Sequence, residues 1–359
     1  MKLSKARMFG QNRRERTSFP NIVTDALRRV VLPSAVLYFH GVVPTLDDRR
    51  VQTLHFETDT FVALLRNIGR HCDFMPLSAY GDFIAGKRPR KRPVVFLTSD
   101  DGYQNNLHTA LPLLQEMGIP LATFVSTDHI SKGIRFPTYI MRCFLYYASK
   151  GEYRLPHIAG KVLVDHSESS KHWNGVIGQR LKSIRLDQVH DVIAAMTDII
   201  GHSQMLELDD RFCSDRPLTW LEVDQLEKQG VIIGAHAMHH AILHANEEHA
   251  VVREQIFGSV DVLRQRYGLC QYLSYPSGST RAVSAQALLS ARQSGAQLAF
   301  TTHGGTIAAS LDAQLIPRVH LSPLGRRNTA RLYTSWRDDR ALRAWQRSLV
   351  RQMDMLSAS

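Results

Sequence analysis

The sequence predicts an α/β fold with a parallel β-sheet, because apolar runs typical of buried strands alternate with segments of helical spacing. The alternation runs over residues 31–126 and returns over residues 217–302. Potentially reactive side chains follow several predicted strands, at the edge where parallel α/β folds form their active sites. The chain has 359 residues, 44% of them hydrophobic and 21% charged, which is enough apolar material for one large domain.

The first part of the alternation contains three predicted strands. The apolar run VLPSAVLYFHGV (31–42) indicates a buried strand that ends at His40. The segment DTFVALLRNIGRHC (59–72) then has helical spacing, with Asp59 as a candidate N-cap. The elements that follow are the strand VVFLT (94–98), the helix LHTALPLLQEMG (107–118) and the strand LATFVS (121–126).

The alternation is interrupted at residues 131–215, which carry helical patterns and polar connections, so we expect a mostly helical insertion there. A helix follows at 217–230, where Thr219 and Glu222 make a capping box and Gly230 a C-cap. The later elements are the strand VIIGAH (231–236), a helix at about 246–267, the strand and turn QYLSYPSG (271–278), the helix AVSAQALLSARQSG (282–295) and the strand LAFTT (298–302).

The chain is basic, with a net charge of +11 and a pI near 9.7. Basic residues gather in an N-terminal arm (1–30), in the run KRPRKR (87–92) and in an arginine-rich tail (325–359) that we expect to be helical. We interpret KRPRKR as a solvated loop before a strand. No nucleic-acid fold signature accompanies the charge, which argues against a nucleic-acid partner. We therefore divide the chain into the arm, a barrel domain over 31–324 and the tail.

Targeting signals are missing from the sequence. No apolar stretch approaches the roughly 18–20 residues of a membrane span, and the basic N-terminus lacks the apolar region of a secretory signal. We therefore expect a cytoplasmic protein, with its basic segments in peripheral contact with the anionic inner face of the membrane. The four cysteines are widely separated without a C-x-x-C pair, so we expect buried free thiols rather than disulfides.

Side chains that can bind a metal or transfer a proton lie at the ends of the predicted strands. His40, the pair Asp100–Asp101 and His236 each follow a strand, and His240 lies four residues after His236. One helical turn would place both imidazoles on the same face, and one carboxylate would complete a metal site with three protein ligands and open positions. Adjacent aspartates at a strand exit point in different directions, so one can bind metal while the other acts as a base.

Each of these assignments has an alternative. The histidines near residue 240 include His239 and His244, and this spacing also occurs in surface histidine clusters without a metal. His40 is a candidate general acid on the leaving-group side because it too ends a strand. Its alternative is a core histidine that is hydrogen-bonded to the backbone.

Several segments resemble the motifs of the polysaccharide deacetylases, the family of the NodB-homology domain (carbohydrate esterase family 4). The segment SDDGYQNNLHTALPLLQEMGIPLATFVST (99–127) is similar to the first motif, GAHAMHHAIL (234–243) to the second and YPSG (275–278) to the third. Upstream, YFHGV (38–42) resembles the YHxV element of a circularly permuted subgroup of this family. The segment IPRVHL (316–321) resembles its closing element.

The resemblance implies a deformed (β/α)7 barrel that hydrolyses an N-acetyl, less often an O-acetyl, group of a saccharide substrate. It makes Asp101, His236 and His240 the ligands of a divalent metal, with Zn²⁺ as the default ion for two histidines and one carboxylate. Asp100 becomes the general base. In the permuted subgroup the histidine at the position of His40 is the catalytic acid.

The resemblance also assigns the backbone N–H at Ser277 to the tetrahedral oxyanion. Ser277 itself replaces an aromatic residue that often lines the sugar site. Other departures are Ser99 in place of the usual Phe, Ala237 in place of Ser or Thr, and Ala241 in place of Pro. The arginine that orients the base in the third motif is absent, and Arg318 from the last predicted strand is the candidate substitute.

The sequence therefore favours a metal-dependent deacetylase acting on an acetylated saccharide or glycan intermediate. Two other functions remain open at this point. One is a non-catalytic barrel that only binds saccharide, against which the retention of both aspartates and both histidines argues. The other is a hydrolase of amides or imides that keeps the same catalytic residues.

Overall fold

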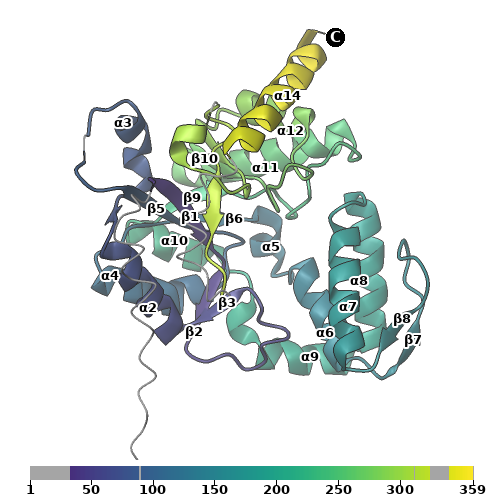
Figure 1. The fold of residues 1–359 in the computed structure, drawn as a ribbon. Coiled ribbons are helices and arrows are strands. Elements are labelled where there is room, and N and C mark those ends of the chain that lie inside the picture. Colours follow the sequence, from purple (N-terminus) through teal and green to yellow (C-terminus); the bar gives the residue numbers. More distant parts are fainter. Residues whose placement is uncertain (1–32, 89, 311, 324–338, 359) are drawn as a thin grey trace, which may run out of the picture. The chain divides into compact units, whose positions relative to one another are not determined.

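The computed structural model describes residues 33–88, 90–310, 312–323 and 339–358. A mostly parallel sheet of eight strands forms the centre of this part of the chain, in the order β11-β10-β9-β6-β5-β1-β12 with β4 beside β5 (Figure 1). The strands are β1 (Ala35–Phe39), β4 (Asp73–Phe74), β5 (Val94–Ser99), β6 (Leu121–Val125), β9 (Ile232–Ala235), β10 (Tyr272–Ser274), β11 (Leu298–Phe300) and β12 (Arg318–His320).

The sheet curls into a nearly closed barrel, in agreement with the fold that the sequence predicts. Phe300 at the end of β11 forms a parallel bridge with Ile316, which brings the last strand in the order back toward the first. β1 pairs with β5 on one side and with β12 on the other, always in parallel. The carboxyl ends of these strands therefore lie at one edge of the barrel, as the sequence analysis requires.

Apolar side chains fill the barrel interior. Val36, Phe96, Phe124, Phe300 and Ile316 are fully buried and belong to one hydrophobic cluster. Large aromatic rings from three different strands thus replace solvent at the barrel axis, and their burial stabilises the fold by about 1.5–3 kcal/mol for each side chain.

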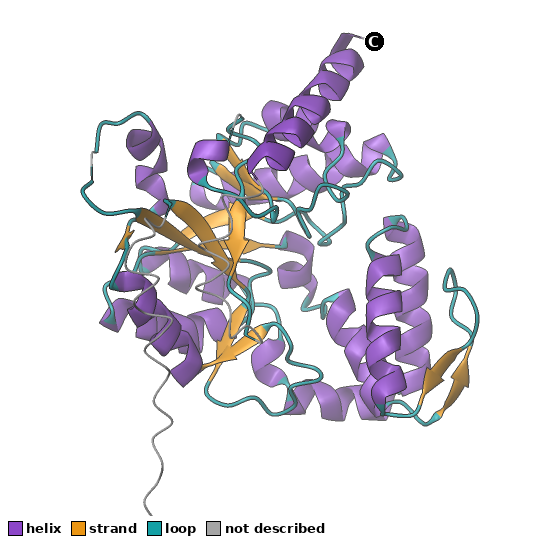
Figure 2. Ribbon diagram, viewed as in Figure 1, coloured by secondary structure: helices purple, strands orange, loops and turns teal. Residues whose placement is uncertain are grey.

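Helices surround the barrel (Figure 2). They are α2 (Thr58–Gly69), α3 (Tyr80–Ile84), α4 (Leu111–Glu116), α5 (Thr127–Lys132), α10 (Trp220–Lys228), α11 (His249–Tyr267) and α12 (Ala285–Gln293). The predicted helix over 107–118 begins as a π-helical turn, η2 (Asn106–Ala110), before α4. The short strands β2 (Gly41–Val43) and β3 (His55–Glu57) form a separate parallel pair, and 3₁₀ turns occur at η1 (Leu77–Ala79), η3 (Cys213–Asp215) and η4 (Ile307–Ala309).

A helical insertion lies between β6 and β9, within the range expected from the sequence. Its helices are α6 (Pro137–Tyr147), α7 (Glu168–Leu181), α8 (Leu186–Ile200) and α9 (His202–Arg211). It also contains an antiparallel hairpin that the sequence analysis missed, β7 (Gly151–Tyr153) with β8 (Val162–Val164). These strands are too short to show a periodic signal.

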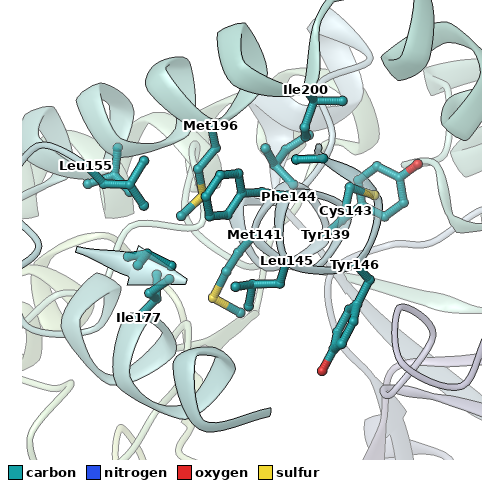
Figure 3. Packing of buried hydrophobic residues seen from close by; sticks show 14 of the residues in the cluster. Tyr139, Met141, Cys143, Phe144, Leu145, Tyr146, Leu155, Ile177, Met196 and Ile200 are labelled. Carbon is teal, nitrogen blue, oxygen red and sulfur yellow. The ribbon is translucent and has the colours of Figure 1, made fainter. Parts of the chain in front are cut away.

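The insertion has a hydrophobic core of its own (Figure 3). Phe144 of α6, Ile177 of α7 and Met196 of α8 are completely buried, and Leu155 beside the hairpin contributes from the loop. A separate core explains how a segment of this length stays folded beside the barrel.

The C-terminal helix is α14 (Asp339–Ala358). Residues 324–338 of the tail before it lie outside the described residues. The same holds for residues 1–32, which include the predicted basic arm. Leu342, Leu349 and Met353 form the buried face of α14. Among the described helices, including this one, none has the length and apolar character needed to cross a membrane. The domain boundaries given by the sequence stay a prediction.

Three of the four cysteines are buried free thiols, as the sequence predicts. Cys72, Cys143 and Cys270 are buried free thiols, but Cys213 is exposed, which corrects the expectation for that residue. Cys213 begins the short turn η3 after α9, and such connecting segments run over the protein surface.

Candidate active site

Asp100 and Asp101 directly follow β5, in a turn with a strained backbone. Asp101 has a φ of 74° and Gly102 a φ of 79°, both in the left-handed region. A β-carbon on Gly102 would lie 3.0 Å from a methyl group of Val125, so only glycine fits the turn without a shift. The positive φ of Asp101 is uncommon for a residue with a side chain, and such strain concentrates at functional sites.

Asp101 meets two histidines at the carboxyl edge of the barrel. Its Oδ1 lies 3.4 Å from Nε2 of His236 and 3.2 Å from Nε2 of His240. One ligand atom from each of the three residues falls within 4.8 Å of the others. Burial raises the pKa of Asp101, but His240 and His236 beside it hold the value well below the ordinary range. The three residues predicted as metal ligands therefore converge.

The backbone that brings the histidines together differs from the expectation. His236 directly follows β9, and the residues up to His240 form an irregular loop rather than a helical turn. Ala237 and His240 both have left-handed conformations, with φ of 58° and 53°. The predicted helical turn is wrong because two left-handed residues reverse the chain within five positions. The same two imidazoles are nevertheless placed beside Asp101.

The three residues fit a divalent metal ion. His236 Nδ1 lies 2.7 Å from the Ser274 carbonyl oxygen, which can only accept, so the proton sits there and Nε2 presents its lone pair to the cluster. Oδ1 of Asp101 is buried and accepts no hydrogen bond from the described residues. Two imidazole nitrogens and one carboxylate oxygen match the donor set of catalytic Zn²⁺ sites.

Asp100 is held by an arginine from the opposite end of the chain. Nη1 and Nη2 of Arg318, in β12, each donate to one carboxylate oxygen of Asp100 at 2.7 Å. Arg318 is completely buried, and it also donates to Thr98 Oγ1 at 3.1 Å and to Ser274 Oγ at 2.7 Å. Burial raises the pKa of Asp100, but the guanidinium of Arg318 lowers it by more, so the pKa lies below its ordinary value. The carboxylate is thus kept ionised and fixed in orientation.

His40 lies just after β1 and lines the cavity above the aspartates. Burial lowers its pKa, although Asp101 and Asp100 act in the opposite direction. Its Nδ1 has no hydrogen-bond partner among the described residues, so this nitrogen shows no backbone bond of the kind the alternative interpretation required. Its ring lies edge-on to that of His320, with centroids 5.5 Å apart.

Ser277 is placed in the tight turn after β10, with a φ of 58°, and it lines the same cavity. Gly278 follows with a φ of 39°, and a β-carbon there would lie 2.6 Å from the backbone nitrogen of Thr302. The turn therefore depends on glycine at 278.

Sequence reasoning missed several residues of the site. His320 ends β12 and lines the cavity, so the rule that marked the other strand ends would have found it. Burial and the nearby Asp101 raise the pKa of Tyr103 well above its ordinary value. Ser274 supports both His236 and Arg318. No local sequence pattern predicts this role for a buried serine, so its contacts are known only from the structure.

A cavity of about 1110 Å³ opens above these residues. Asp100, Asp101 and His40 line its floor, and residues of the helical insertion line another part of its wall, including Arg142 and Ile193. This volume admits more than one sugar-sized group. The insertion therefore contributes to the wall of this cavity.

The sequence profile described as polysaccharide deacetylase matches residues 87–299. This range includes both aspartates, His236 and His240, whereas His40 and Arg318 lie outside it. Two solved structures share the fold at low sequence identity. The Streptococcus pyogenes deacetylase PplD in complex with acetate is 14% identical, with a TM-score of 0.53 and coverage of 84% of this chain and 99% of its own. IcaB from Ammonifex degensii is 15% identical, with a TM-score of 0.51 and coverage of 87% and 96%.

A comparison with curated protein sequences finds no match. The profile nevertheless covers more than half of this chain, and it covers the part that carries the two aspartates and two histidines. The chain belongs to the polysaccharide deacetylase family.

Proposed function

We propose that this chain is a metal-dependent deacetylase that removes N-acetyl groups from a saccharide or polysaccharide intermediate. The observation that carries the proposal is the convergence of Asp101, His236 and His240 beside an ionised Asp100 at the floor of a large cavity. A barrel that only binds sugar has no need for a buried carboxylate whose orientation is fixed by an arginine.

Asp101, His236 and His240 would hold the ion, with Zn²⁺ as the first choice for this donor set. When bound, a divalent ion there would polarise the acyl carbonyl and ease the ionisation of water. Ser274 positions the imidazole of His236 through its carbonyl oxygen, which fixes the nitrogen that faces the ion.

Asp100 acts as the general base in this proposal. Two hydrogen bonds from Arg318 keep the carboxylate deprotonated and aimed into the cavity, so it can accept a proton from the attacking water. The backbone N–H of Ser277 stabilises the charge that develops on the carbonyl oxygen as the tetrahedral intermediate forms.

His40 acts as the general acid. It lies at the end of β1, in the same cavity as Asp100 and on a different strand. Because burial lowers the pKa of its imidazole, the protonated ring is a stronger acid than an exposed histidine. It donates a proton to the nitrogen as the C–N bond breaks, which leaves acetate and a free amine on the sugar.

The direct test measures acetate release from N-acetylated oligosaccharides, together with the metal content of the purified protein. We expect about one equivalent of divalent metal and an activity that a chelator abolishes and Zn²⁺ restores. A protein that binds the oligosaccharide but takes up no metal and releases no acetate would instead be a saccharide-binding barrel. Release of ammonia or ring opening from a cyclic imide, without action on sugars, would favour the other hydrolase function.

A further inference from the structure

Cations outnumber carboxylates in the wall of the active-site cavity. Its positively charged lining residues are Lys132, Arg135, Arg142, Lys182 and Arg281. Among the described lining residues the carboxylates are Asp100 and Asp101, and both are already engaged at the catalytic floor. A cavity with this imbalance attracts a ligand that carries negative charge.

Two of the five cations have acidic partners. Lys132 Nζ lies 2.7 Å from Asp128, and Arg135 Nε lies 2.8 Å from Asp209. Within the part of the chain that the structure describes, Arg142 and Lys182 have no carboxylate at ion-pair distance. Both belong to the helical insertion, Arg142 in α6 and Lys182 directly after α7.

Arg142 uses few of its five donors. Its Nη1 donates to the Val51 carbonyl oxygen at 3.3 Å, and its Nε is buried without an acceptor among the described residues. Asp215 is near enough to raise the pKa of Arg142, but burial of the guanidinium has the larger and opposite effect. The carboxylate of Asp215 is already bonded to Gln52 and paired with His55, each at 3.0 Å.

Arg142 and Lys182 line the wall of the same cavity. Partial burial in the cavity wall lowers the pKa of Lys182, although the side chain keeps contact with solvent, and the positive charge of Arg142 lowers it further. Two like charges that share a cavity wall without a counterion destabilise the ligand-free protein, and a bound anion would remove this cost.

The two cations are also near the catalytic floor. Both line the same cavity as Asp101 and His240. Phe136, directly before the α6 helix that carries Arg142, has its ring centroid 5.6 Å from that of His240 and 5.1 Å from that of Tyr103. A saccharide whose acetyl group reaches Asp101 would therefore extend toward Arg142.

We propose that Arg142 and Lys182 form an anion-binding subsite, and that it takes a phosphate or carboxylate group carried by the saccharide substrate. Arg142 offers a planar pair of donors that matches either oxyanion, and Lys182 adds a flexible point charge. The inference rests on the proposed deacetylase function, because it defines the substrate class of the same cavity.

Binding of inorganic phosphate to the purified full-length protein, measured by calorimetry, tests the subsite directly. We expect Lys182→Gln and Arg142→Gln each to weaken phosphate binding by about tenfold, the loss typical of one hydrogen bond to a charged group. Lys182 is exposed, so this variant should fold. The matched control is Lys150→Gln, an exposed lysine of the same insertion that does not line the cavity. Equal affinity in Lys182→Gln and Lys150→Gln would overturn the proposal.

Kinetics then separate the subsite from the deacetylase function. The first anionic substrate carries a phosphate, such as N-acetylglucosamine 1-phosphate, and the second is an N-acetylated disaccharide with a uronate. For each of them kcat/KM is compared with that of the neutral N,N′-diacetylchitobiose. We expect the ratio of anionic to neutral substrate to fall about tenfold in Lys182→Gln and to stay constant in Lys150→Gln. A fall in the ratio for the phosphate substrate identifies phosphate as the group bound, and a fall for the uronate substrate identifies carboxylate.

The two possible failures give different results. If acetate is released from all three saccharides and the ratio is the same in every variant, the subsite is refuted while deacetylation stands. If no saccharide is hydrolysed but phosphate binding still depends on Lys182, the subsite stands as an anion site and the deacetylase function is refuted.

Discussion

Arg318 holds Asp100 with two hydrogen bonds of 2.7 Å, although the two residues are 218 positions apart in the chain. β12, which carries Arg318, pairs with β1, and β1 pairs with β5, which ends immediately before Asp100. The strand order therefore makes the contact, and both side chains are buried. Removal of the guanidinium would leave a buried carboxylate with no counterion, which is among the costly defects in a protein core.

We predict that Arg318→Lys lowers kcat by about 100-fold, the lower end of what general-base catalysis contributes. A lysine cannot donate two parallel hydrogen bonds, so Asp100 loses its fixed orientation. Metal content should remain at the wild-type level, because Arg318 does not touch the three ligand residues. The matched control is Arg266→Lys, which alters an exposed pairing with Asp224. Wild-type kcat in Arg318→Lys would contradict an orienting role.

The adjacent aspartates should respond differently to the same chemical change. Asp100→Asn removes a base that lies outside the ligand cluster, so we expect turnover to fall by about 10²–10⁴-fold while metal stays bound. Asp101→Asn removes a ligand, so we expect the loss of both metal and turnover. Metal analysis of the two purified variants, alongside steady-state kinetics, checks the assignment. Retention of metal in Asp101→Asn and its loss in Asp100→Asn would reverse the two roles.

Two histidines at the cavity edge compete for the role of general acid. The resemblance selects His40, and the structure places the ring of His320 with its centroid 5.5 Å from that of His40. We predict that His40→Gln lowers kcat by about 10²–10⁴-fold, whereas His320→Gln has a smaller effect. A larger loss of kcat in His320→Gln than in His40→Gln would assign the general acid to His320 of β12. Measurement of kcat with an activated ester substrate adds a control, because a good leaving group needs no acid and should reduce the difference.

The sequence predicted the positions of residues at strand ends, because strand order alone determines these positions. His40, Asp100 and His236 follow β1, β5 and β9, and parallel strands bring these ends to one edge. The loop from His236 to His240 could not be predicted in detail, because left-handed conformations at non-glycine residues have no reliable local signal. The partner of Asp100 was equally hidden, since its contact depends on the whole strand order.

Ser99 shows a second limit of the sequence. Its hydroxyl donates to Thr123 Oγ1 at 2.8 Å, and the two residues are partners in the register of β5 and β6. Both are completely buried on the face of the sheet opposite Phe96 and Phe124, so this hydrogen bond gives each hydroxyl a partner away from water. Ser99 thus has a hydrogen-bond partner on the neighbouring strand, a contact that depends on the register of β5 and β6.

The helix α10 provides a prediction on stability that is independent of catalysis. Glu222 closes the capping box with Thr219 and accepts two hydrogen bonds from Arg216, at 2.8 and 3.0 Å. Burial raises the pKa of Glu222, but Arg216 and the other hydrogen bonds outweigh burial and lower it from 4.5 to about 2.

Because the folded-state pKa lies below the unfolded value, Glu222 stabilises the fold fully above pH 4.5, and this contribution is lost as pH falls toward about 2. We predict that Glu222→Gln lowers the free energy of unfolding by about 3 kcal/mol at pH 7, with a difference that shrinks below pH 4.5. Urea denaturation across this pH range measures it, and Glu227→Gln, an exposed residue of the same helix, is the control. A pH-independent difference between wild type and Glu222→Gln would mean that the contribution of Glu222 comes from packing rather than from its charge.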